Sequence, residues 1–143
     1  MNPREFYELA KALSRRQGPA ELRSSISRAY YASYLSGRSL LNGLGLPIAK
    51  NLRGHGMLQQ RLSHSSNAII KGTGEKLKDL HSYRIQADYD MDENAPEKPG
   101  TAAFCVLQAK QIIDTLDQCQ SEPLRTQLKN TVEDYNSRFG STF

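Results

Sequence analysis

The chain has 143 residues, of which 38% are hydrophobic and 24% are charged. This length fits a single domain, and this hydrophobic fraction is too high for a chain that stays disordered. No apolar run is long enough to cross a bilayer, and the first residues lack the basic start and apolar stretch of a signal peptide. We therefore expect a soluble, cytoplasmic protein that does not bind membranes.

The net charge of +4 hides an asymmetry between the two parts of the chain. Residues 1–87 hold 14 Lys and Arg against 5 Asp and Glu, whereas residues 88–143 hold 5 against 10. A basic half of this kind can attract nucleic acid. It can equally be a solvated surface, or pair with the acidic half of another copy, because no basic run exceeds two residues.

The first two helices are expected near the N-terminus. Asn2 is a good N-cap and Pro3 suits the first helical position, and Gly18 ends this helix before Pro19. Its apolar stripe consists of Phe6, Leu9, Ala10 and Leu13. The second helix should run over about 19–42.

Small residues recur along the second helix. Ala29, Ser33 and Gly37 stand four residues apart, a spacing that lets a neighbouring helix approach closely. An aromatic band crosses the same surface and consists of Tyr30, Tyr31 and Tyr34.

The rest of the chain also shows helical periodicity, and no segment has the alternating pattern of a half-buried strand. The expected elements are a short helix within 50–62, a loop at 63–66, a break at 72–74, a helix over about 75–89, a loop at 90–100, a helix over about 101–120 and an amphipathic segment from 123 onward. The fold class is therefore all-α, with one domain over 1–120 and a C-terminal helical extension, 121–143, packed on the same domain.

Neither cysteines nor histidines suggest a metal site. Cys105 and Cys119 stand fourteen residues apart in one expected helix, about 21 Å of rise, which is too far for a disulfide within that helix. No Cys/His spacing is typical of zinc binding, and we expect no cofactor. His64 lies in a serine-rich loop and is expected to be a solvated surface residue.

A charge interrupts the apolar stripe of the helix over 75–89. Leu77, Leu80, Arg84 and Ala87 follow one another at spacings of three, four and three. His81 and Asp88 project from the same side as Arg84, being three and four residues away from it. The cluster is either a functional site or only an i,i+4 ion pair beside the core, since a core-facing guanidinium needs a partner, a cleft or another subunit.

Two segments together resemble the HEPN family. They are Ser27–Tyr34, which reads SRAYYASY, and Arg84–Tyr89, which reads RIQADY. Their order and separation resemble a branch of small prokaryotic proteins with these two helices, over about residues 5–118. The resemblance implies an up-and-down bundle of four to five core helices and a homodimer, and the C-terminal helix is expected in addition from its own amphipathic pattern.

The resemblance also implies a setting and a site. Many HEPN proteins are metal-independent ribonucleases encoded as toxins beside a nucleotidyltransferase-type antitoxin, or serve in phage defence, and others bind nucleotides or act as scaffolds. Arg84 matches the arginine of the nuclease motif, in which a histidine follows four to six residues later. Here no histidine follows Arg84, and Tyr89 occupies the earliest matching position.

Two hypotheses remain. In the first, Arg84 binds the phosphate of RNA and His81 or Tyr89 transfers protons, with Asp88 beside them, since cleavage without metal needs a base, an acid and a cation. In the second, the protein is a catalytically inactive module that binds a nucleotide or a partner such as a nucleotidyltransferase, which could also modify Tyr89. The binding residues expected around the site are Tyr30, Tyr34, Arg28 and His55.

Overall fold

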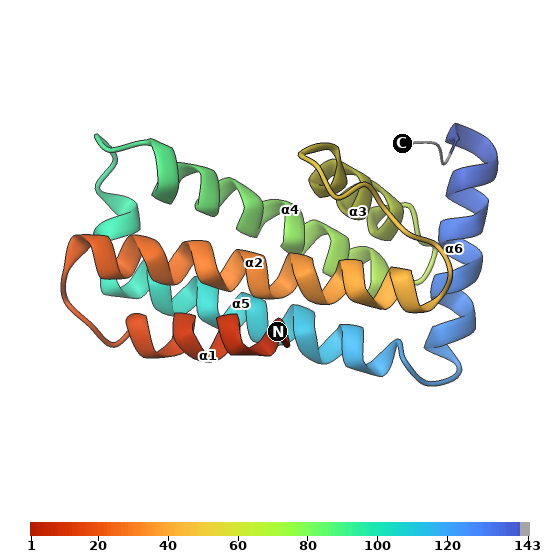
Figure 1. Cartoon of the computed structure of the whole chain (residues 1–143), viewed down its shortest axis with the longest axis horizontal. Helices are drawn as coiled ribbons and strands as arrows, with labels where there is room; N and C mark the ends of the chain where they lie inside the picture. The colour runs from red at the N-terminus through yellow and green to blue at the C-terminus, as the bar shows by residue number, and fades with distance from the viewer. Residues whose placement is uncertain (141–143) are drawn as a thin grey trace.

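The computed structural model describes residues 1–140, and within them it contains six α-helices and no strand (Figure 1). The elements are α1 (Arg4–Leu13), α2 (Pro19–Gly43), α3 (Arg53–Ser63), α4 (Ala68–Tyr89), the 3-10 helix η1 (Ala95–Glu97), α5 (Pro99–Gln118) and α6 (Leu124–Phe139). The expectation of an all-α fold is confirmed.

Helices α1, α2, α4 and α5 lie side by side and alternate in direction, which makes an up-and-down bundle (Figure 1). α2 is its centre, because it packs against α1, α4 and α5. The row of small residues on α2 allows close packing, since a side-chain carbon added at Gly37 would stand 2.7 Å from the Leu58 side chain of α3. Short α3 packs mainly against α4 and α6.

One expectation for the helix boundaries was wrong, and two others differ in detail. The break expected at 72–74 lies inside α4, which begins at Ala68 because the Asn67 side chain caps it by accepting from the amides of Ile69 and Ile70. Gly74 serves close packing instead, since an added carbon would stand 2.6 Å from the backbone nitrogen of Ser63. The loop at 90–100 contains η1, and α5 begins earlier than expected, at Pro99.

The first helix also differs in detail from its expected pattern. Pro3, not Asn2, is the N-cap residue, although the Asn2 side chain still accepts from the Arg4 amide at 3.0 Å. Leu9 was expected in the buried stripe but is 45% exposed, because only one flank of the short α1 meets the bundle and Ala10 is its fully buried residue.

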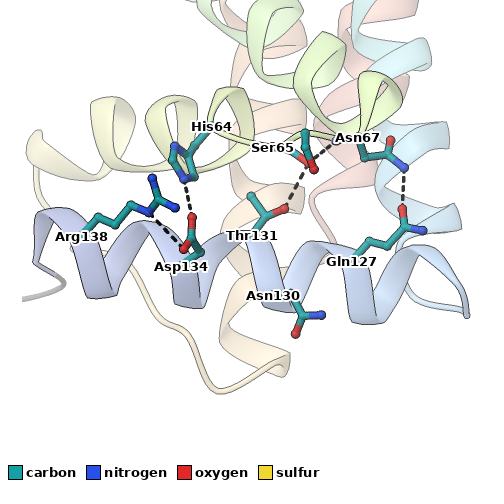
Figure 2. A pocket seen from close by; sticks show the side chains of 9 residues that line it. His64, Ser65, Asn67, Gln127, Asn130, Thr131, Asp134 and Arg138 are labelled. Carbon is teal, nitrogen blue, oxygen red and sulfur yellow. Dashed lines mark hydrogen bonds and ion pairs between the residues drawn. The ribbon is translucent and has the colours of Figure 1, made fainter.

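α6 runs across one end of the bundle and packs on α3 (Figure 1). Its apolar anchors, Leu128 and Val132, are fully buried. The rest of the seam is polar (Figure 2) and borders a hollow of about 720 Å³. His64 was expected to be a solvated surface residue, but it is only partly exposed and its Nε2 lies 2.8 Å from the Asp134 carboxylate across this seam. The other polar pairs in Figure 2 are Ser65 with Thr131, Ser65 with the backbone of Asn67, Asn67 with Gln127, and Asp134 with Arg138.

Cys105 and Cys119 are both buried free thiols. Within residues 1–140, none of the helices is long and apolar enough to span a membrane.

Candidate functional site

Arg84 is buried in the middle of the face that α4 turns toward α2. The residue is only 7% exposed, as predicted from its position in the apolar stripe of the helix. Aromatic rings surround the guanidinium, whose central carbon lies 5.5 Å from the Tyr30 ring centre, 5.3 Å from that of Tyr31 and 5.9 Å from that of Tyr89. These distances are within the range of cation–π attraction, which partly offsets the loss of water around the charge.

The polar partners of Arg84 come from its own helix. Arg84 Nη1 donates to Asp88 Oδ2 at 3.3 Å, and Nη2 donates to His81 Nε2 at 3.4 Å. Asp88 is also held by the Ser27 hydroxyl of α2, at 3.2 Å. Arg84 Nε is buried without a hydrogen-bond partner among the described residues. A charged donor is thus left unsatisfied, and both hydrogen bonds to the guanidinium are long.

Two histidines stack beside this guanidinium. His81 of α4 and His55 of α3 lie with ring centres 5.3 Å apart and planes only 6° from parallel. The Tyr30 ring stacks on His81 at 4.9 Å, and the Tyr34 ring stacks on His55 at 4.3 Å. The stack therefore joins α2, α3 and α4. Gln59 of α3 completes it, since its carboxamide lies 3.0 Å from His81 Nδ1.

Both histidines are neutral bases in this setting. Burial, followed by the electrostatic effects of His81 and Arg84, lowers the pKa of His55 to about 4. Burial and then the Arg84 charge also lower the pKa of His81. A guanidinium only donates hydrogen bonds, so His81 Nε2 accepts and a neutral His81 carries its proton on Nδ1, facing Gln59. The lone pair of Nε2 thus faces Arg84 and accepts its long hydrogen bond.

The Tyr30 hydroxyl orients the second histidine. It lies 2.5 Å from His55 Nδ1, and burial raises the pKa of Tyr30, so the phenol keeps its proton. When this phenol donates to Nδ1, His55 carries its own proton on Nε2. Tyr30 and Tyr34, the two tyrosines of the expected binding set, therefore pack against the histidines and hold them in place. Tyr30 is fully buried and Tyr34 nearly so, and neither offers a free face to a base.

A second buried arginine, Arg23 of α2, holds the end of α4 that carries Asp88 and Tyr89. Its Nη1 donates to the carbonyls of Ala87 at 2.9 Å, Asp90 at 3.1 Å and Gln86 at 3.3 Å. Its Nη2 donates to the Glu93 carbonyl at 2.8 Å, and its Nε donates to the Glu97 carboxylate at 2.8 Å. Cations favour the C-terminal ends of helices, where carbonyls lack partners. Arg23 therefore stabilises the last turn of α4.

The structure brings most of the expected site residues together. His81, Asp88, Arg84 and the ring of Tyr89 form one cluster with His55, Tyr30 and Tyr34. Arg28 lies at its edge, in contact with Tyr31, a residue that also contacts Arg84.

Sequence reasoning missed Gln59, Tyr31 and Arg23 as parts of the site. Arg23 could have been found by the criterion that found Arg84, because it occupies an inward position between Leu22 and Ile26. Gln59 had no such signal, since only the packing of α3 on α4 brings it to His81.

The comparisons with known proteins bear on the same elements. The family model of the HEPN domain matches residues 3–119, which include α1 to α5 and every residue of the cluster. No curated protein and no solved structure gave a significant match. The family match covers well over half of the chain, and its limits lie close to residues 5 and 118, the limits of the resemblance noted from the sequence. The chain belongs to the HEPN domain family.

Proposed function

We propose that this HEPN protein acts on RNA as a metal-independent ribonuclease in a toxin–antitoxin or phage-defence type system. The observation that carries the proposal is the placement of a neutral histidine nitrogen, His81 Nε2, within 3.4 Å of a buried guanidinium, Arg84. Cleavage of RNA through its own 2′-hydroxyl needs a base beside a cation that holds the phosphate. The pair supplies both within one turn of α4.

The proposed reaction uses three side chains. Arg84 binds the scissile phosphate and stabilises the negative charge that develops on it. Arg84 Nη2 turns from His81 to the phosphate, and the freed Nε2 takes the proton of the 2′-hydroxyl, whose oxygen then bonds to phosphorus as the bond from phosphorus to the 5′-oxygen breaks. Tyr89 is 73% exposed, and its phenol gives its proton to the leaving 5′-oxygen. The products are a 2′,3′-cyclic phosphate and a 5′-hydroxyl.

The remaining residues position this pair. Asp88 accepts from Arg84 Nη1, whereas His81 accepts from Nη2, and Ser27 holds Asp88. His55 stacks on His81 and keeps that ring in place. Because His55 is itself neutral at neutral pH, it adds no positive charge beside Arg84. We propose these as positioning roles.

The test is cleavage of a labelled single-stranded RNA by purified protein in the presence of a chelator. Arg84→Gln and His81→Asn should each lower the rate by about 100-fold or more, the usual contribution of a positioned base or of a charge-stabilising donor. The matched controls remove the same residue types elsewhere: Arg125→Gln and His64→Asn should cleave like the unaltered chain. Equal rates for Arg84→Gln and the unaltered chain would refute the proposal.

The second candidate is a catalytically inactive module that works with a nucleotidyltransferase. Its supporting observation is that a tyrosine, exposed beside Arg84, stands where the nuclease motif places a histidine. In that case Tyr89 would be the acceptor of a nucleotidyl group. Mass spectrometry of the protein co-expressed with a neighbouring nucleotidyltransferase would show the added mass, and Tyr89→Phe would abolish it.

We also propose that the protein is a homodimer. The exposed side chains of Ile85 and Tyr89 stand one turn apart on α4 and offer apolar surface beside the site. Light scattering after gel filtration gives the mass directly. A monomeric mass at micromolar concentration would refute the proposal.

A further inference from the structure

Cationic and aromatic side chains alternate across three helices of one face. Phe6 of α1 contacts Arg28 of α2, Arg28 contacts Tyr31, Tyr31 contacts Arg84 of α4, and Arg84 contacts Tyr89. We propose that Arg28 is a second phosphate-binding position, which holds the phosphate of a neighbouring nucleotide when single-stranded RNA has a phosphate on Arg84. This inference rests on the proposed action on RNA, because the phosphate on Arg84 sets the position of the strand.

The guanidinium of Arg28 is held in place while its donors stay available. Its central carbon lies 4.7 Å from the Phe6 ring centre and 5.0 Å from the Tyr31 ring centre, so two rings restrict its position. Within residues 1–140, Arg28 has no ion pair with a carboxylate, unlike Arg23 and Arg84. Ordering the side chain beforehand lowers the entropy lost when a ligand binds. The residue is only half-buried, which leaves the guanidinium accessible.

The spacing of the two arginines suits one strand of RNA. Arg28 lies 5.0 Å and Arg84 5.3 Å from the same Tyr31 ring centre, so the two guanidinium carbons can be no farther apart than the sum of those distances. Phosphates follow one another every 3.4 Å or so of rise along a strand in a duplex, and farther apart when the strand is extended. Two cations at this spacing can therefore hold phosphates of neighbouring nucleotides. The strand would cross α2 from α4 toward α1.

The chemistry of the row favours RNA over an acidic peptide. Planar guanidinium groups bind two phosphate oxygens at once, and aromatic rings between them suit the bases of a single strand. The groove next to Arg28, lined by Leu9, Leu13 and Ser24 among others, contains one carboxylate, that of Glu21. Glu21 pairs with Arg16 at 3.6 Å, which offsets its repulsion of a phosphate.

The experiment measures binding apart from cleavage. A short, labelled 2′-O-methyl RNA lacks the 2′-hydroxyl that attacks phosphorus, so its affinity can be titrated over a range of salt concentrations. Each phosphate contact contributes about 0.7 to the slope of log affinity against log salt for a single strand. Arg28→Gln should lower that slope by about 0.7. Arg125→Gln, an exposed arginine on α6 that removes the same charge, should leave the slope unchanged.

Each result decides the inference. A slope for Arg28→Gln equal to that of the unaltered chain would overturn it, as would an equal loss for Arg125→Gln, since binding would then follow net charge alone. Displacement of the RNA by polyglutamate of equal charge, at equal concentration, would overturn the preference for phosphate. Absence of RNA binding by the unaltered chain would overturn this inference and the proposed function together. Normal cleavage by Arg84→Gln would overturn the role of Arg84 in cleavage, whereas a slope for Arg28→Gln lower by about 0.7 would still support phosphate binding by Arg28.

Discussion

Arg23→Met tests whether the last turn of α4 depends on a charge supplied by α2. Methionine keeps much of the side-chain volume but removes every donor. The change deletes hydrogen bonds to four backbone carbonyls and one carboxylate, and Arg23 itself is only 8% exposed. Breaking a buried charged pair costs about 3–5 kcal/mol. The bond to Ala87 is buried, whereas the other four are partly exposed, so water can replace part of the loss.

We therefore expect a loss near the lower limit, about 3 kcal/mol of unfolding free energy, or a fall in Tm on the order of 10 °C for a chain of this size. Chemical denaturation followed by circular dichroism measures the loss. Hydrogen exchange should also show faster exchange at the C-terminal end of α4. The control is Arg15→Met on the exposed surface, which should cost less than about 0.5 kcal/mol. Equal stability of the two variants would refute the role assigned to Arg23.

Three more predictions concern the stack, the packing of the start of α3 on the loop before it, and the C-terminal helix. His55 has a pKa of about 4 in the folded chain and about 6.5 in the unfolded chain, so the unfolded chain binds more protons between these pH values and the free energy of unfolding should fall as pH drops through that window. Denaturation at several pH values measures this fall. His55→Gln should flatten the pH dependence, and an unchanged dependence in that variant would contradict the role of His55. Gly54→Ala should cost about 1–3 kcal/mol, because the added carbon collides with the Ala49 carbonyl oxygen, and calorimetry showing an unchanged Tm would contradict this. Leu128→Ala should cost about 2–5 kcal/mol in a single unfolding transition if α6 belongs to the same cooperative unit; a separate early transition would instead show an independent extension.

The number and order of helices followed from the sequence because helical periodicity is a local property. Arg84 could be singled out for the same reason, since a charge on an apolar stripe is visible without any tertiary contact. The start of α4 was misplaced because glycines 72 and 74 are ordinarily helix breakers. Here the Asn67 cap and the close contact of Gly74 with α3 outweigh their weak helix propensity.

The sequence by itself determined an all-helical fold and a buried arginine on the fourth helix, because both depend on residues within a few turns of one another. Only the tertiary structure decided what surrounds that arginine. His55 and His81 become a parallel stack because α3 and α4 each pack against the tyrosines of α2, and the Tyr31 ring of α2 reaches Arg84 of α4 for the same reason. Such contacts join residues far apart in the chain, and their geometry follows from how whole helices pack.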